Sequence, residues 1–227
     1  MNETKLKEFD IKSVTFRLGT SPKVLIIGRR STGKTFLAGE ILKHHQDLPR
    51  GTIIAGLEEE RQVYSNIVPT ATIHKEYDPS IIEDIAKNQR QIYKGIKDWC
   101  AESDSLKTFV VLDNCFYDQT WYQEKHVRFL FTHGCNYKIM SILTMNHPLG
   151  IPPVLRSQIE YIFVLKESYL QNRRRIWEHY CSEFITFENF CKIMDQTTNN
   201  HDCLVINNHA KTNNIEDIFF WYRGHNI

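Results

Sequence analysis

Residues 28–35 have the composition and spacing of a loop that binds nucleotide phosphates. Their sequence, Gly-Arg-Arg-Ser-Thr-Gly-Lys-Thr, matches the pattern G-x-x-x-x-G-K-S/T at every fixed position. Gly28 and Gly33 allow the backbone to bend so that its amides point at one centre, where they can hold an anion. In a loop of this kind Lys34 reaches the β- and γ-phosphates, and the Thr35 hydroxyl binds Mg²⁺. We therefore expect this whole segment to form a site for ATP and Mg²⁺: Gly28, Arg29, Arg30, Ser31, Thr32, Gly33, Lys34 and Thr35.

The segments on both sides of the loop support this assignment. Residues 23–27 are an apolar run typical of a strand, and residues 35–42 continue with helical spacing. A strand before the loop and a helix after it are what a phosphate-binding loop requires, whereas an ordinary glycine-rich turn needs neither. The chain has no guanine-selecting N-K-x-D element, which favours ATP over GTP without deciding between them.

A second apolar strand ends in the carboxylate that a phosphate-binding loop needs. Residues 108–113 read Thr-Phe-Val-Val-Leu-Asp, and we expect Asp113 to hold the Mg²⁺ shell together with Thr35. A carboxylate after an apolar run is also common at a solvated strand end. The assignment of Asp113 therefore depends on the phosphate loop that accompanies it.

The residue after Asp113 is Asn114, at the position where a water-activating carboxylate is usual. An amide can position water through hydrogen bonds, but it cannot take a proton. Base strength matters less if phosphoryl transfer is loose and mainly electrostatic, yet Asn114 still argues against fast turnover. Carboxylates that could replace the missing acid are Asp118 and the three glutamates 58–60, a run that we expect to lie in a solvated loop.

Asn146 is a further polar candidate, because it follows the strand expected over 138–144. If that strand neighbours the strand over 23–28, Asn146 would lie beside the γ-phosphate and could sense its presence. The alternative is an ordinary turn that leads into Pro148. We expect the adjacent His147 to be a turn or packing residue rather than a catalytic one.

Strand-like and helical segments alternate along the chain. Hydrophobic residues make up 41% of the 227 residues, which is enough for a core. Several expected strands are apolar on both faces, as in a parallel sheet covered by helices, so the order predicts a three-layer α/β fold with a mostly parallel central sheet. Expected strands are 23–28, 52–57, 108–113, 138–144, 159–165 and 203–207, and expected helices are 33–46, 80–99, 121–134, 167–180 and 186–195.

We expect one domain over 1–227, with an N-terminal extension over 1–20 and a C-terminal edge strand or tail over 209–227. The net charge is +1, so contact with nucleic acid would need a local patch or several subunits acting together. Six cysteines are scattered without a C-x-x-C pair, which argues against zinc and for reduced thiols in a cytosol-like compartment. No apolar run is long enough to span a membrane.

Motifs along most of the chain give a more specific indication. The most discriminating is Leu-Gly-Ile-Pro-Pro at 149–153, whereas the phosphate loop is generic. The segments concerned are 28–35, 111–118, 142–153, 155–163, 172–175, 178–180, 190–196 and 203–206. From about residue 20 to its end, the chain resembles the genome-packaging ATPases of nucleocytoplasmic large DNA viruses, which belong to the FtsK–HerA superfamily of P-loop motors. It departs from that family in having Asn114 where a second acid is usual and Asn146 where glutamine is common.

The resemblance implies a RecA-like P-loop ATPase that assembles into a ring, a pentamer or hexamer, and drives double-stranded DNA into a preformed capsid. Capsid or vertex proteins would be further partners, and the host cytoplasm at viral assembly sites, with the virion, would be the location. An arginine from a neighbouring subunit would stabilise the transition state. Arg156 is the first candidate, followed by the cluster 173–175, and Arg29 and Arg30 could also face a neighbour.

Two other functions remain open at this stage. A small-molecule or nucleotide kinase would use the same loop, with the arginines at 173–175 as part of a lid. Alternatively, the chain could bind ATP as an assembly subunit whose hydrolysis is impaired by Asn114.

Overall fold

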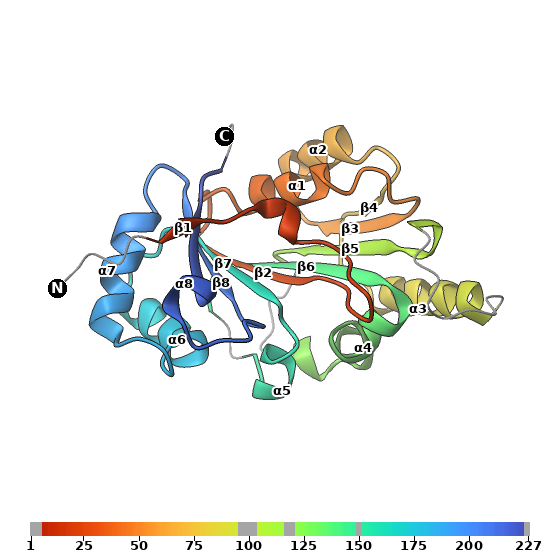
Figure 1. Ribbon diagram of the computed structural model, residues 1–227. Coiled ribbons are helices and arrows are strands. Elements are labelled where there is room, and N and C mark those ends of the chain that lie inside the picture. The colour runs from red at the N-terminus through yellow and green to blue at the C-terminus, as the bar shows by residue number, and fades with distance from the viewer. Residues whose placement is uncertain (1–5, 95–103, 116–120, 149–150, 225–227) are drawn as a thin grey trace.

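The computed structural model describes residues 6–94, 104–115, 121–148 and 151–224, and within them nine strands form one sheet (Figure 1). The strands are β1 (Lys7–Glu8), β2 (Lys23–Ile27), β3 (Gly51–Ala55), β4 (Thr72–His74), β5 (Thr108–Asp113), β6 (Ile139–Met145), β7 (Tyr161–Val164), β8 (Cys203–Asn207) and β9 (Phe219–Tyr222). Their order across the sheet is β1-β9-β8-β7-β2-β6-β5-β3-β4. Pairing is parallel except where β8 meets β7 and β9.

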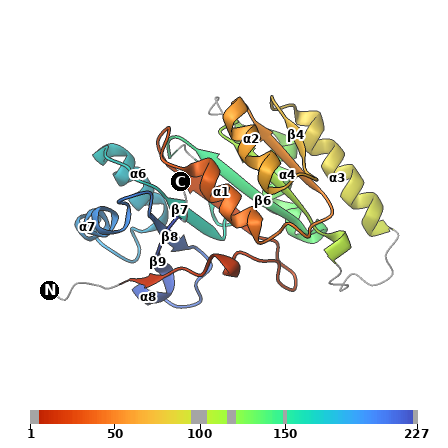
Figure 2. The same cartoon turned by 90° about the horizontal axis from the view of Figure 1, so that it is seen from above.

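Helices cover both faces of this sheet (Figure 1). The helices are α1 (Lys34–Lys43), α2 (Glu58–Ile67), α3 (Pro79–Lys94), α4 (Lys125–His133), α5 (Pro153–Arg156), α6 (Leu170–Tyr180), α7 (Phe187–Thr197) and α8 (Ile215–Ile218). One apolar cluster joins the sheet to α1 and α2, and another joins its opposite face to α3, α4, α6 and α7. Figure 2 shows α1 and α2 lying side by side over their face of the sheet. The predicted architecture, a three-layer α/β fold with a mostly parallel central sheet, is confirmed.

The central strands are apolar on both faces because each face is covered. All five residues of β2 are buried, with Val24 and Ile26 in the cluster under α1 and Leu25 and Ile27 in the opposite one. This alternation follows from the two-residue period of a strand. Burial on both faces explains why the strand appears in the sequence as a continuous apolar run.

The neighbouring strands β2, β6, β5 and β3 run parallel, so their carboxyl ends meet at one edge of the sheet. The register aligns Ile27 with Met145, Asp113 with Thr144, and Ala55 with Asp113. Residues 28–33 leave this edge from β2 and lead directly into α1. The fold therefore brings the phosphate loop and the carboxylate of the second motif to the same side of the molecule.

The structure corrects several details of the sequence prediction. The glutamates expected in a solvated loop begin the helix α2, and two short strands, β1 and β4, were not predicted. The segment 219–222 forms a strand, but β1 pairs outside it, so it is not the edge strand. The helix expected over 121–134 is a 3₁₀ turn at Trp121–Gln123 followed by α4, and the last residues of the helix expected over 80–99 lie outside the described residues.

Among the residues described, we find no helix with both the length and the apolar character that crossing a membrane requires.

Candidate nucleotide-binding site

The loop between β2 and α1 has the backbone geometry that its glycines predict. Gly33 has φ of 99°, and Ser31 has φ of 62°, so two residues of the loop occupy the left-handed region. A Cβ atom at Gly28 would lie 2.5 Å from Thr32 Oγ1 and 2.8 Å from Leu165 Cβ, so this position has no room for a side chain. The loop is closed further by Thr32 Oγ1, which donates a hydrogen bond of 2.7 Å to the Arg29 carbonyl oxygen.

Lys34 is the first residue of α1, and its side chain is only 7% exposed. Its Nζ atom donates to the Arg29 carbonyl oxygen at 2.9 Å, so the ammonium group is folded back over the loop. Burial lowers the pKa of Lys34, and the negative charges of Asp113 and Glu60 oppose this shift. The first-turn amides of α1 have no helical acceptors, and together with Lys34 they form an environment that favours a phosphate group.

Asp113 lies at the carboxyl end of β5 and is 1% exposed. Its Oδ2 atom accepts hydrogen bonds from Thr35 Oγ1 at 2.8 Å and from the Tyr64 hydroxyl at 2.7 Å. The hydroxyl of Thr144, on β6, donates to Oδ1. Hydroxyl groups from α1, α2 and β6 therefore surround one buried carboxylate, which agrees with the rule that buried charges are paired or hydrogen-bonded.

Thr35 and Asp113 also fit the chemistry of a magnesium site. Mg²⁺ prefers oxygen ligands, and proteins commonly supply only one or two of them, with phosphate oxygens and water completing the shell. The Thr35 hydroxyl and the Asp113 carboxylate are two oxygen donors in direct contact beside the phosphate loop. The structure thus brings together the two residues that the sequence assigned to the metal.

Asn114 occupies a turn for which asparagine is suited. Its φ of 52° is in the left-handed region, which asparagine tolerates better than most residues. Its backbone N–H donates to Thr144 Oγ1 at 2.9 Å, so the same threonine holds both Asp113 and the backbone that follows it. The left-handed backbone therefore gives a conformational reason for asparagine at this position.

Asn146 follows β6 directly, and β6 is the parallel neighbour of β2. A role for Asn146 beside the γ-phosphate required that its strand neighbour the strand before the phosphate loop, and the structure has the two strands paired. The Gly28 N–H donates to the carbonyl oxygen of Met145 at 3.0 Å, which holds the start of the loop against the strand that carries Asn146. The side chain of Asn146 is partly buried.

Among the acids considered as substitutes for the missing base, Glu60 is brought to the site. Glu60 is partly buried, and both burial and the charge of Asp113 raise its pKa. Glu58 and Glu59 are exposed, and Glu58 forms an ion pair with Arg61. Asp118 lies outside the described residues.

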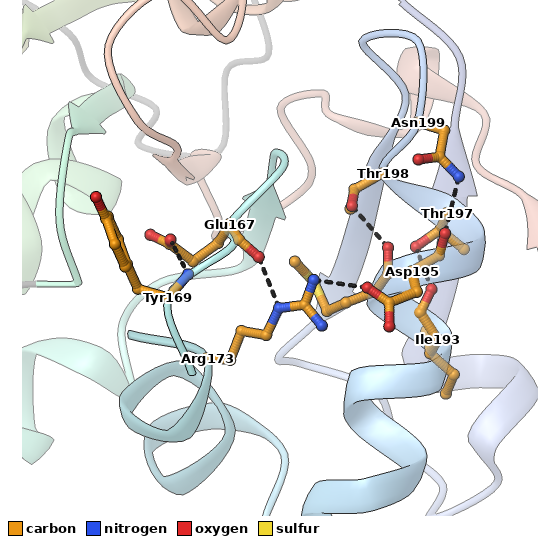
Figure 3. A network of polar contacts seen from close by, with 9 residues as sticks. Glu167, Tyr169, Arg173, Ile193, Asp195, Thr197, Thr198 and Asn199 are labelled. Atoms are coloured by element: carbon orange, nitrogen blue, oxygen red, sulfur yellow. Dashed lines mark hydrogen bonds and ion pairs between the residues drawn. The ribbon is translucent and has the colours of Figure 1, made fainter. Parts of the chain in front are cut away.

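The arginines proposed from the sequence lie in very different environments. Arg173 is buried: its Nε donates to the Glu167 carbonyl oxygen, and its Nη2 forms an ion pair with Asp195 at 2.6 Å (Figure 3). It therefore links the start of α6 to α7. Arg29 and Arg30 are exposed in the loop, and the Arg29 guanidinium lies 4.8 Å from the ring centre of Tyr169.

Arg156 ends α5, just before β7, and so lies near the amino ends of the parallel strands. The phosphate loop lies at their carboxyl ends. Arg156 is partly buried in a surface pocket that His179 and Tyr180 also line. The structure therefore does not bring Arg156 together with Lys34 and Asp113 of its own chain.

Sequence reasoning missed Tyr64 and Thr144, which hold Asp113. Tyr64 is four residues after Glu60, so the two share a face of α2, and this spacing was a usable signal once the segment was known to be helical. Thr144 was included in the segment before Asn146 but was given no role. Its register opposite Asp113 could not be known without the pairing of β5 and β6.

The fold and this site define a P-loop NTPase. Comparisons with known proteins show which solved structures share this fold. The chain is similar in structure to the genome packaging NTPase B204 of Sulfolobus turreted icosahedral virus 2 in complex with AMPPCP, with a TM-score of 0.61 and 16% identity over 90% of this chain and 98% of that chain. The DNA-packaging ATPase B204 of Sulfolobus turreted icosahedral virus gives a TM-score of 0.62 at 14% identity, covering 89% of this chain and 97% of that one. At these identities the likeness shows a shared fold.

Relatives by sequence come from large DNA viruses. The chain is 29% identical to an uncharacterized protein of Invertebrate iridescent virus 6, over 96% of this chain and 86% of that protein. It is 27% identical to an uncharacterized protein of Acanthamoeba polyphaga mimivirus, over 98% of this chain and 78% of that protein. No protein-family model matches the chain. The resemblance to viral genome-packaging ATPases, first drawn from the motifs, is confirmed by these similarities.

Proposed function

We propose that the protein is the ATP-driven motor subunit that moves viral double-stranded DNA into a preformed capsid, with Mg²⁺-dependent hydrolysis of ATP. The observation that carries the proposal is the meeting of Lys34, Thr35 and Asp113 at one edge of a sheet whose fold is that of viral packaging NTPases. The neighbour with that fold has been seen with AMPPCP and with ATP-γS, which supports ATP as the nucleotide.

Each residue of the site has a defined task in this reaction. The loop amides and Lys34 bind the β- and γ-phosphates, and Lys34 offsets the charge that develops on the transferring group. Thr35 and Asp113 hold Mg²⁺, which neutralises phosphate charge when it is bound. Asn114 and Asn146 position water, and Asn146 also reports whether a γ-phosphate is present.

A ring of subunits, a pentamer or hexamer, supplies what one chain lacks. Arg156 is too far from the phosphate loop of its own chain to act there, so it serves the site of a neighbour as the transition-state cation. The net charge of +1 suits a motor that grips the DNA backbone through loops from several subunits and does not read bases. Capsid or vertex proteins are the further partners, and viral assembly sites in the host cytoplasm, with the virion, are the location.

The test measures phosphate release with and without double-stranded DNA, together with the mass of the particle in the presence of ATP. We expect DNA-stimulated release of free phosphate by an oligomer, and a release slower by about 10²–10³-fold in the Lys34→Ala variant. A phosphorylated small-molecule acceptor in place of free phosphate would show a kinase. ATP binding without any hydrolysis would show an assembly subunit, and either result would overturn the proposal.

A further inference from the structure

The second motif of this chain lacks an acid, because Asn114 follows Asp113. If the protein hydrolyses ATP as proposed above, some other group must accept the proton of the attacking water, since an amide cannot. Among the described residues, a suitable group would be a carboxylate that is close to the phosphates, partly shielded from solvent and not already paired with a cation.

Glu60 is held at the site by the way α2 is attached. The Tyr64 hydroxyl donates to Asp113 Oδ2 at 2.7 Å, which fixes one face of α2 against the carboxyl end of β5. Glu60 precedes Tyr64 by four residues, so it lies one turn earlier on the same face. At the start of the helix, the Leu57 N–H donates to Glu60 Oε2 at 3.3 Å, which orients the carboxylate.

The strand before α2 places this first turn beside the second motif. Ala55, the last residue of β3, pairs with Asp113 in the register of the sheet. Arg61 donates to the carbonyl oxygens of Ala55 and Gly56, at 3.0 and 2.7 Å, and so fixes the connection between β3 and α2. The position of Glu60 relative to Asp113 is thus determined by strand pairing, by the Arg61 contacts and by the Tyr64 hydrogen bond.

The charge of Glu60 acts on the groups that define the site. It favours the charged form of Lys34, on α1, and it helps to raise the pKa of Tyr64 and that of Cys115, which follows β5. Burial and the like charge of Asp113 raise the pKa of Glu60 itself. Because its pKa is raised by burial and by Asp113, the Glu60 carboxylate is a stronger base than a solvated glutamate. Its neighbour Glu59 is exposed.

We propose that Glu60 is the general base of ATP hydrolysis in this protein and replaces the acid that is missing after Asp113. Glu60 takes a proton as the O–H bond of water breaks, and the water oxygen forms a bond to the γ-phosphorus. The bond between the γ-phosphorus and the bridging oxygen breaks, and its electron pair leaves with ADP. Glu60 then returns the proton to solvent. Asn114 keeps the left-handed turn and orients the water.

Glu60→Gln tests the assignment, with Glu59→Gln as the matched control. The glutamine keeps the size of the side chain and an oxygen that can accept from the Leu57 N–H, so folding should be preserved, which thermal unfolding checks. We expect hydrolysis to fall by about 10²–10⁴-fold in Glu60→Gln, while a fluorescent ATP analogue still binds as it does to the wild type. Glu59→Gln should hydrolyse ATP within about twofold of the wild type, since Glu59 is exposed to solvent and has no part in the proposed proton transfer.

The pH profile distinguishes a base from a residue that only supports the loop. Lys34, Asp113, Glu59, Tyr64 and Cys115 are the ionisable groups whose charges act on Glu60 or respond to it. In the wild type, hydrolysis should be lost as the pH falls through the raised pKa of Glu60. The residual activity of Glu60→Gln should lack this acid limb.

The results separate this assignment from the proposed function. A wild-type protein that hydrolyses ATP, with a Glu60→Gln variant that keeps its rate, would overturn the assignment alone. A wild type that binds ATP without hydrolysing it would overturn the proposed function and this assignment with it.

Discussion

The two ends of the parallel strands carry different kinds of residue. At the carboxyl ends, Lys34, Thr35 and Asp113 converge and are joined by hydroxyl groups from two other elements. At the amino ends lie Arg156 and Glu160, and Glu160 forms an ion pair with Arg17 at 3.2 Å. At the carboxyl ends a buried carboxylate is surrounded by hydroxyl groups, whereas at the amino ends the buried carboxylate of Glu160 is paired with an arginine and Arg156 is only partly buried.

The distance between the two ends separates residues that act within a chain from those that can act only between chains. The five residues of β2 span roughly 16 Å at about 3.3 Å per residue. An arginine side chain cannot cross this distance through a packed sheet. The phosphate loop and Arg156 of one chain must therefore serve different nucleotides, if both serve a nucleotide.

Two hydrogen bonds hold the backbone around Arg156 in place. Asn208 Nδ2 donates to the carbonyl oxygens of Arg156 and Ile159, at 3.0 and 2.8 Å, and so ties α5 to the segment after β8. The pKa of His179 is lowered by burial and then by the positive charge of Arg156, which keeps this neighbour neutral. An arginine on a fixed backbone, beside a neutral histidine, suits an ion pair with a negatively charged site of another subunit.

Arg156→Ala should give the largest effect, and the effect should appear only in the assembled oligomer. A transition-state arginine supplied by a neighbour is worth roughly 10³–10⁵ in rate, so hydrolysis should fall by that order while ATP binding is unchanged. Phosphate release and equilibrium nucleotide binding check both parts, with the exposed Arg128→Ala as control.

Mixing two inactive variants tests whether the phosphate loop of one chain works with Arg156 of another. Subunits with Lys34→Ala and subunits with Arg156→Ala should each be inactive, but a mixture should regain part of the activity. In the mixture, an intact loop of one chain meets an intact Arg156 of another. If the mixture stays inactive although mixed oligomers form, the two ends do not cooperate between chains.

Lys34→Ala should have the next largest effect, and it should appear in a single chain. Lys34 is the buried cation of the loop, so its removal should lower hydrolysis by about 10²–10³-fold and weaken ATP binding as well. Titration with a fluorescent nucleotide measures the binding. Unchanged binding would show that the loop is not the phosphate site.

Thr144→Val should lower the stability of the protein by removing hydrogen bonds to Asp113 and Asn114, without removing a group proposed to contact phosphate. The substitution leaves Asp113 with two hydroxyl donors and leaves the Asn114 N–H without its acceptor. An unmet hydrogen bond of a buried group costs about 1–3 kcal/mol, so the free energy of unfolding should fall by that amount. Urea unfolding measures it, and Thr144→Ser, which keeps the hydroxyl, should be close to the wild type.

The sequence predicted the contiguous parts of the site and missed the parts made by tertiary contacts. Residues 28–35 and Asp113 carry local signals, a motif and an apolar strand with a terminal carboxylate. Tyr64 and Thr144 reach Asp113 from 49 and 31 positions away, so no local pattern shows them.

The centre and the edge of the sheet also differ in how well their elements were predicted. The strands β2 and β5 are buried on both faces and so have continuous apolar sequences. The glutamate run 58–60 was expected in a solvated loop, and α2 was not predicted, because Tyr64 is its one buried residue and gives no apolar period. The three glutamates of its first turn, which favour a helix N-terminus, were the available signal. At the edge of the sheet, β1 has two residues, too few for a period to be recognised.

A substitution of His45 should have the smallest effect. It tests whether a residue near the amino ends of the strands affects stability without affecting ATP binding. It follows α1, which starts at the carboxyl ends of the strands and therefore ends near their amino ends. Its ring is buried, its Nε2 lies 2.8 Å from the Val14 carbonyl oxygen, and burial lowers its pKa below the ordinary 6.5. In the window from about pH 6.5 down to the lowered pKa, the unfolded chain binds a proton that the folded chain resists.

The stability contributed by His45 is therefore complete above about pH 6.5 and is lost as the pH falls through that window. His45→Gln keeps a donor for Val14 and cannot titrate, so its free energy of unfolding should fall less than that of the wild type between pH 7.5 and 5.5. Urea unfolding at the two pH values measures this, with the exposed His44→Gln as control. ATP binding should be unaffected by His45→Gln at pH 7.5, because the ring lies at the opposite end of α1 from Lys34. A loss of ATP binding in that variant would mean that the amino end is coupled to the nucleotide site within one chain.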